Sequence, residues 1–372
     1  MVKLFRLVDR YQRWRAKSRV RSGAPAGVLL LSAGGLGDTV LFSHVIEAFC
    51  RCAGKDEKIT VLLRRDGART GFLLPASVAT LSVDFKRFHR DMRYRLEMSN
   101  QLYQANYRRV ISTDYLRHPD LDEAMALAAQ APECIAMVAR PWAKYQNRLD
   151  RNAGRFTRLF DSGPARHDKL LRWFRFASWI SGEPAKPGLK RIKASVSAKA
   201  EPPLVLIQPF SAVKAKQLAP AVYGALIDAL GDDVAVRITG APGEMDANPP
   251  FKALLARPNV EFEDAGFEPL LALLQTARLV VSVDTAVMHL SVAAGAPTLC
   301  LASAAYVGEI VPYAPELQPS HVDFYYKSMD CEGCLGTCIK SLRGGAFPCI
   351  AELEPDVIIE KALKLFAGSA VS

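Results

Sequence analysis

Residues 279–303, LVVSVDTAVMHLSVAAGAPTLCLAS, constrain the fold more than any other stretch of the chain. They begin with four apolar residues and one serine, a composition typical of a strand buried on both faces of a parallel sheet. Good helix formers follow over residues 288–294, and Gly295 and Pro297 end that helix before a second apolar run over residues 298–302. A strand, a helix and a second strand in this order predict a parallel α/β sheet.

Polar side chains follow the first of these strands. Asp284 and Thr285 come directly after it, and His289 stands four residues beyond Thr285. Ligands of open α/β sheets bind outside the carboxyl ends of the strands, and a helix N-terminus directs free N–H groups at an anion. We therefore expect an anion-binding site here. For His289 the alternative is a hydrogen-bonded histidine of the core.

The alternation of strands and helices continues through both halves of the chain. Apolar runs predict strands over residues 27–32, 59–63, 110–113, 204–208, 234–239, 260–262, 279–283 and 298–302. Helical periodicity predicts helices over residues 39–51, 121–131, 169–180, 221–230, 268–277 and 354–367, and residues 86–109 are expected to be helix with a mobile connection. A chain of 372 residues with this pattern is expected to form two doubly wound parallel-sheet domains.

Breaks in composition at residues 182–187 and 199–203 place the expected domain boundary. The predicted organisation is therefore a basic amphipathic N-terminal helix (residues 1–22), an N-terminal domain (23–185), a C-terminal domain (200–353) and a C-terminal helix (354–372). No apolar run approaches the roughly 20 residues of a membrane span. The start is too charged for a signal peptide, so we expect a cytoplasmic protein.

The net charge of +10 favours an anionic partner, either nucleic acid, an anionic membrane face or a phosphorylated substrate. The first 21 residues carry eight lysines or arginines and one acid, Asp9. Apolar side chains, among them Leu7, Tyr11 and Trp14, recur there at helical spacing. This pattern indicates either a helix lying on an anionic membrane surface or a solvated arm packed on its own domain.

A glycine-rich turn, AGGLGD over residues 33–38, follows the first predicted strand. Its glycines, Gly35 and Gly37 among them, let the backbone turn tightly and approach a ligand, although the spacing is that of neither a dinucleotide fingerprint nor a phosphate loop. Asp38 then starts a helix. It is either a helix cap or a general base, and spacing alone favours the cap.

Three further charged residues follow strands of the second half. Lys214 and Lys216 come after the strand over residues 204–208, where a lysine could neutralise a diphosphate. Glu244 follows a Gly-Ala-Pro-Gly turn, where a carboxylate could accept hydrogen bonds from sugar hydroxyls. Solvated surface residues are the alternative for all three.

Four cysteines cluster late in the chain, at Cys331, Cys334, Cys338 and Cys349. Thiols at this spacing could hold Zn²⁺ in a structural site, and free thiols in a packed loop are the alternative. Disulfides are not expected in a reducing cytosol.

Together these motifs resemble glycosyltransferase family 9, the ADP-heptose:lipopolysaccharide heptosyltransferases and their relatives. The resemblance rests on Gly35-Leu36-Gly37-Asp38, on a lysine motif after the first strand of the second half, and on residues 284–290 followed by Gly-Ala-Pro. It covers about residues 28–357, and the late cysteine loop also looks like one common in the family. The family usually has glycine where Ala286 stands, and a tryptophan common after the lysine is absent here.

The resemblance implies a GT-B fold, with two Rossmann-like domains facing across a cleft. It implies an inverting, metal-independent transfer of a sugar, heptose from ADP-heptose, to a lipopolysaccharide core or related glycan, without a cofactor. By this resemblance Asp38 is the catalytic aspartate, which reverses the preference from spacing. The remaining family positions would bind substrate: Gly35, Gly37, Lys216 (with Lys214 as a rival), Glu244, Asp284, Thr285, Ala286 and His289.

Two other classes of function stay open. A nucleotide-sugar epimerase on the same fold would consume a nucleotide sugar without an acceptor. A non-catalytic basic protein could bind a membrane or nucleic acid, but basic charge alone would not require the Gly-Asp and Asp-Thr-His motifs. We therefore expect a transferase that binds no nucleic acid and lies in the cytoplasm, with peripheral attachment to the inner face of the membrane as a further expectation.

Overall fold

The computed structural model describes residues 2–16, 20–193 and 200–369. The chain divides into two compact units. Unit 1 comprises Met1–Ala165 and Leu170–Pro187, and unit 2 comprises Arg166–Lys169 and Gly188–Ser372. Part of the expected boundary (residue 199), of the N-terminal helix (1 and 17–19) and of the C-terminal helix (370–372) lies outside the described residues.

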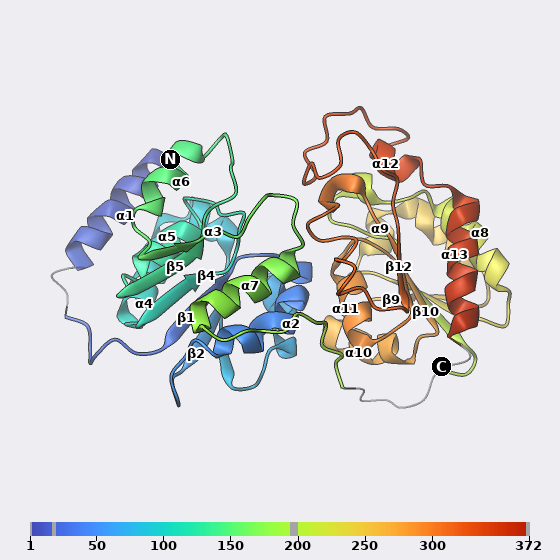
Figure 1. The fold of residues 1–372 in the computed structure, drawn as a ribbon. Coiled ribbons are helices and arrows are strands. Elements are labelled where there is room, and N and C mark those ends of the chain that lie inside the picture. The colour runs from blue at the N-terminus through green and yellow to red at the C-terminus, as the bar shows by residue number, and fades with distance from the viewer. Residues whose placement is uncertain (1, 17–19, 194–199, 370–372) are drawn as a thin grey trace. The chain divides into compact units, whose positions relative to one another are not determined.

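Unit 1 contains a six-stranded, fully parallel sheet (Figure 1). Its order is β3-β2-β1-β4-β5-β6. The strands are β1 (Val28–Ser32), β2 (Ile59–Arg64), β3 (Val78–Val83), β4 (Arg109–Ser112), β5 (Glu133–Met137) and β6 (Arg158–Phe160). Every residue of β1 is buried, with Leu30 opposite Val61 and Ile111, because helices cover both faces of the sheet.

Seven helices of unit 1 are described, and all but the first lie against or beside this sheet. They are α1 (Val2–Ala16), α2 (Leu36–Cys50), α3 (Phe85–Arg90), α4 (Met92–Gln104), α5 (Asp122–Ala128), α6 (Gln146–Ala153) and α7 (Lys169–Ser181), with a 3-10 segment η1 (Gly67–Leu73). Helix α1 packs on α4 and α5, so it covers helices rather than the sheet itself.

Unit 2 repeats the arrangement, with a parallel sheet in the order β12-β11-β10-β7-β8-β9. Its strands are β7 (Leu204–Gln208), β8 (Ala235–Thr239), β9 (Val260–Glu263), β10 (Leu279–Val283), β11 (Thr298–Leu301) and β12 (Val322–Tyr325). Its helices are α8 (Pro220–Leu230), α9 (Glu244–Ala247), α10 (Phe267–Thr276), α11 (Ala286–Ala294), α12 (Pro348–Ala351) and α13 (Pro355–Gly368), with 3-10 segments η2 (Lys214–Lys216), η3 (Pro249–Ala256) and η4 (Ala304–Tyr306).

The structure corrects several sequence-based boundaries. Residues 86–109 hold two helices, α3 and α4, because Asp91 ends the first and its carboxylate caps the second by accepting from the Tyr94 N–H. Helices α2 and α11 begin at Leu36 and Ala286, earlier than their apolar periodicity indicated. Strands β3, β5, β6 and β12 were not predicted; β3, for example, lies at a sheet edge with residues of mixed exposure, which weakens the apolar signal.

None of the helices in the described parts of the chain combines the length and apolar character needed to span a membrane.

Candidate functional site

Each sheet reverses its strand order once, between β1 and β4 in unit 1 and between β7 and β10 in unit 2. In doubly wound sheets, ligands bind outside the carboxyl ends of the strands at such a reversal. The glycine turn follows β1, Lys216 follows β7, and Asp284 follows β10. Asp38, Lys216 and Asp284 therefore follow the strands that flank these reversal points.

In unit 2, Lys216 and Asp284 form a buried ion pair. The Lys216 Nζ lies 2.6 Å from Asp284 Oδ1 and donates to the Asp284 main-chain oxygen at 3.2 Å. Both side chains are less than a tenth exposed, and the Ser303 hydroxyl donates to Asp284 Oδ2 at 3.0 Å. Burial raises the pKa of the Asp284 carboxyl, while the charge of Lys216 opposes that rise.

Helix α11 begins directly beside this pair. Thr285 is its N-cap residue, but its hydroxyl lies 3.4 Å from the Ser282 hydroxyl and does not cap the helix. No described side chain caps the first turn, so the N–H groups at the start of α11 carry partial positive charge beside the Lys216 ammonium, which is paired with Asp284. This arrangement can hold an anion such as a diphosphate.

His289 has a partner in the core. Its Nδ1 lies 2.7 Å from the Tyr313 hydroxyl, and the two rings stack. His289 is 5% exposed. The structure therefore places the His289 side chain in the core, in contact with Tyr313.

Lys214 and Glu244 belong to a neighbouring part of unit 2. The exposed Lys214 donates from Nζ to the Ala247 oxygen at 2.9 Å, at the end of the short helix α9 that Glu244 begins. Glu244 is half-buried, and its Oε1 accepts from Asn248 at 3.0 Å. Of the two candidate lysines, it is Lys216 that lies against Asp284.

In unit 1, Asp38 is the third residue of α2. Its Oδ2 accepts from the Gly35 N–H at 2.8 Å, which is the hydrogen bond of a helix cap. The backbone around it is closely packed, since a Cβ at Gly34 would lie 2.2 Å from the Asp38 Cβ. Glycine is therefore required here by the approach of Asp38, and the turn holds this half-buried carboxylate at the end of β1.

Three charged residues near this turn were missed from the sequence. Asp114 Oδ2 accepts from the Ala33 N–H at 2.7 Å, and Arg64 forms an ion pair with Asp66. The bonded Asp66 carboxylate raises the pKa of Arg64, and the charges of Asp38 and Asp114 add to this. Arg64 ends β2 and Asp114 comes two residues after β4, so the rule on carboxyl ends of strands could have identified both.

The cysteine loop is linked through η4 to the neighbourhood of Lys216 in unit 2. All four of its thiols, those of Cys331, Cys334, Cys338 and Cys349, are free, and they line one cavity of about 10 Å³. Main-chain hydrogen bonds join this loop to η4, whose Tyr306 ring lies 5.0 Å from the Lys216 Nζ. In the described part of the chain, no group of three or more histidine, cysteine or acidic side chains is arranged to hold a metal ion.

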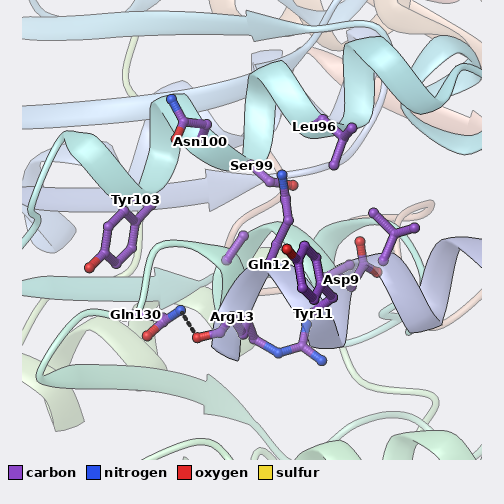
Figure 2. Close-up of a pocket in the computed structure, with 12 residues that line it drawn as sticks. Asp9, Tyr11, Gln12, Arg13, Leu96, Ser99, Asn100, Tyr103 and Gln130 are labelled. Atoms are coloured by element: carbon purple, nitrogen blue, oxygen red, sulfur yellow. Dashed lines mark hydrogen bonds between the residues drawn. The ribbon is translucent and has the colours of Figure 1, made fainter. Parts of the chain in front are cut away.

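A separate cavity of about 310 Å³ lies in unit 1 between α1, α4 and α5 (Figure 2). Asp9, Tyr11 and Arg13 of α1 line one side, and Asn100 and Tyr103 of α4 line the other. None of the sequence-predicted site residues lines it.

The chain is similar to known proteins in its sequence pattern and in its fold. The family model described as glycosyltransferase family 9 (heptosyltransferase) matches residues 91–332. No curated protein matches the chain. Among solved structures, a glycosyl transferase family 9 protein from Veillonella parvula DSM 2008 is similar with a TM-score of 0.66 at 14% identity, over 94% of this chain and 100% of that one.

Two structures from E. coli are also similar. Heptosyltransferase WaaC with ADP has a TM-score of 0.65 at 16% identity, over 91% of this chain and 99% of its own. ADP-heptose lps heptosyltransferase II has a TM-score of 0.59 at 15% identity, over 92% and 99%. The two six-stranded parallel sheets with flanking helices match this GT-B fold. Because the family model covers well over half of the 372 residues, the chain belongs to glycosyltransferase family 9 and is a glycosyltransferase.

Proposed function

We propose that this glycosyltransferase moves a heptose from ADP-heptose to a lipopolysaccharide core or related glycan, with inversion at the anomeric carbon and without a metal ion. The observation that carries the proposal is the buried Lys216–Asp284 pair at the start of α11. A lysine beside uncapped helix N–H groups can neutralise a diphosphate leaving group, which is the role a divalent cation would otherwise have.

In the proposed mechanism, unit 2 binds the donor. Lys216 and the N–H groups of Thr285, Ala286 and Val287 contact the diphosphate, and Glu244 contacts the nucleoside. The pair with Asp284 holds the Lys216 ammonium in place, so little reorganisation is needed as charge grows on the departing diphosphate. His289, packed against Tyr313, supports the helix turn that presents these N–H groups.

Unit 1 binds the acceptor in this mechanism, with Gly35 and Gly37 allowing a close approach to Asp38. Asp38 accepts the proton of the acceptor hydroxyl as its oxygen forms a bond to the anomeric carbon, and the bond to the diphosphate oxygen breaks on the opposite face. The basic charge of the chain favours an acceptor that carries phosphates or carboxylates. We place the enzyme in the cytoplasm, with α1 lying on the inner face of the membrane.

The test is a thermal-shift and turnover panel. The protein is heated with ADP-, GDP-, UDP- and dTDP-sugars, and turnover is measured with each stabilising donor and a truncated lipopolysaccharide acceptor. We expect ADP-heptose to stabilise the protein most and to be consumed only when the acceptor is present. Consumption without acceptor would indicate an epimerase and would contradict the proposal, as would stabilisation by a different nucleotide alone.

A further inference from the structure

A second cavity beside α1 is lined by arginines. It has a volume of about 150 Å³ and lies between α1, α5 and α6 of unit 1. Six arginines line it, and we name it the arginine groove: Arg6, Arg10, Arg13, Arg148, Arg151 and Arg155. Only two carboxylates, those of Asp9 and Asp120, line the same cavity. Six positive charges against two negative charges leave an excess of four.

The two carboxylates are already engaged. Asp120 accepts from Arg6 at 3.0 and 3.2 Å and also pairs with Arg148. Asp9 pairs at 2.7 and 2.5 Å with Arg95, a buried arginine of α4 that does not line the groove. Within the described residues, none of the other four guanidinium groups is paired with a carboxylate. The groove therefore carries positive charge that the described residues leave uncompensated.

Arg13 lies among like charges in this groove. Burial lowers the pKa of Arg13 and the nearby charge of Arg155 lowers it further, while the Asp9 carboxylate opposes this shift. A bound anion between these side chains would remove that repulsion. Phosphate oxygens suit such a site because guanidinium groups bind them in a bidentate manner.

A second feature of α1 lies beside the groove. Leu7, Tyr11 and Trp14 are 58%, 54% and 69% exposed, and the Tyr11 and Trp14 rings are 5.9 Å apart. They recur at the same spacing as Arg6, Arg10 and Arg13, shifted by one residue, so the two stripes run side by side along the helix. Phe5 by contrast is 4% exposed, because another face of α1 packs on the unit.

We propose that the arginine groove binds the phosphate of an anionic lipid headgroup while Leu7, Tyr11 and Trp14 enter the same membrane surface. This inference rests on the proposed location of α1 on the inner face of the membrane, and it assigns the arginine groove and the apolar stripe as the parts of the protein that contact the lipid. Exposed aromatic and leucine side chains beside basic residues are typical of helices that lie in a membrane interface. A soluble phosphorylated ligand would account for the groove but not for the apolar stripe.

The experiment is co-flotation of the full chain with vesicles at physiological salt. Vesicles contain phosphatidylcholine alone or phosphatidylcholine with phosphatidylglycerol or phosphatidic acid. We expect binding to both anionic mixtures and little to phosphatidylcholine. The double variant Arg151→Gln/Arg155→Gln should bind the anionic vesicles at least roughly tenfold more weakly than wild type, since each basic residue near an anionic surface contributes substantially to binding.

The matched control is Lys55→Gln/Lys58→Gln, which removes the same charge from exposed residues in the turn between α2 and β2, outside the groove. It should bind within about twofold of wild type if the groove, rather than net charge, is responsible. Leu7→Gln/Trp14→Gln should weaken binding to every vesicle type. Melting curves verify that each variant is folded.

Three results would overturn the inference. If wild type binds neutral and anionic vesicles equally, phosphate is not recognised. If the arginine variant binds like the lysine control while the stripe variant does not bind, the membrane location stands but the groove assignment fails. If inorganic phosphate stabilises the protein and no vesicle binds it, the ligand is soluble. None of these readouts depends on sugar transfer, so failure of the membrane inference can be distinguished from failure of the proposed transferase function.

Discussion

At the scale of single residues, the geometry of Asp38 is compatible with both a helix-capping role and the proposed role as general base. Its carboxylate accepts from the Gly35 N–H as a helix cap would, and it stands at the carboxyl end of β1, where a substrate would bind. Loss of a helix cap lowers folding stability, whereas loss of a general base lowers turnover. They can therefore be separated by a variant that keeps the hydrogen bond and removes the base.

Asp38→Asn is that variant. The amide oxygen of asparagine can accept the same hydrogen bond from the Gly35 N–H, so the melting temperature should stay near that of wild type. Loss of a general base should lower turnover by ~10²–10⁴-fold, while ADP affinity stays unchanged because the donor is proposed to bind unit 2. The measurements are steady-state turnover, calorimetric titration and a melting curve. Near-normal turnover would leave Asp38 a cap and remove it from the mechanism.

The two candidate lysines give a second test at this scale. Lys216→Met should weaken ADP binding by roughly tenfold or more, because a charge-assisted contact to phosphate is lost. It also leaves Asp284 buried without its counter-charge, so the double variant with Asp284→Asn is needed to restore folding stability. Calorimetric titration with ADP measures all of these variants.

Lys214→Met is the matched control. Lys214 is exposed and contacts the Ala247 oxygen, so its loss should change ADP affinity by less than about twofold. Equal affinity in wild type and folded Lys216→Met, or a larger loss in Lys214→Met, would show that the donor phosphates bind elsewhere.

At the scale of elements, the turn between β1 and α2 positions Asp38 by close backbone contact. Gly34→Ala would place a Cβ 2.2 Å from the Asp38 Cβ and 2.6 Å from its carboxylate oxygen, so the backbone of the turn must shift and displace Asp38. We expect an overpacking cost of roughly 1–3 kcal/mol and a loss of turnover comparable with that of Asp38→Asn. Urea unfolding and turnover measure the two effects.

Gly71→Ala is the control for this turn. A Cβ there would meet the Leu63 Cδ1 at 3.6 Å, an ordinary contact, so turnover should stay near that of wild type. If Gly34→Ala retains normal turnover, the position of Asp38 in this turn is not required for the reaction.

At the scale of the whole molecule, the proposal makes the reaction independent of added divalent cations. In the proposed mechanism, Lys216 and the start of α11 stabilise the charge of the donor diphosphate in place of a divalent cation. Turnover of the full chain should therefore persist in EDTA. Rapid loss of activity restored by Mg²⁺ or Mn²⁺ would contradict the prediction. Slow unfolding in a strong chelator with transfer otherwise intact would instead indicate a metal at the four cysteines.

The two sheets were largely predictable because their central strands carry their own signal. Strands β1, β7 and β10 are short apolar runs that are buried throughout, so hydrophobicity along the sequence predicts them directly. The positions of Asp38, Lys216 and Asp284 after those strands follow from the same runs. Edge strands such as β3 and β6 include exposed or half-buried residues, so they lack a continuous apolar run in the sequence. They form because they pair with a neighbouring strand, and that pairing is not visible in the sequence.

The sequence by itself therefore determined the fold class, the family and the strand ends at which polar residues gather. Only the tertiary structure decided which of these residues meet. Lys216 and Asp284 are 68 positions apart and touch because β7 and β10 are neighbours in the sheet, whereas Lys214 points to α9. Likewise Trp14 is exposed because a different face of α1 packs on unit 1. Such contacts depend on strand order and helix rotation, which residue spacing does not encode.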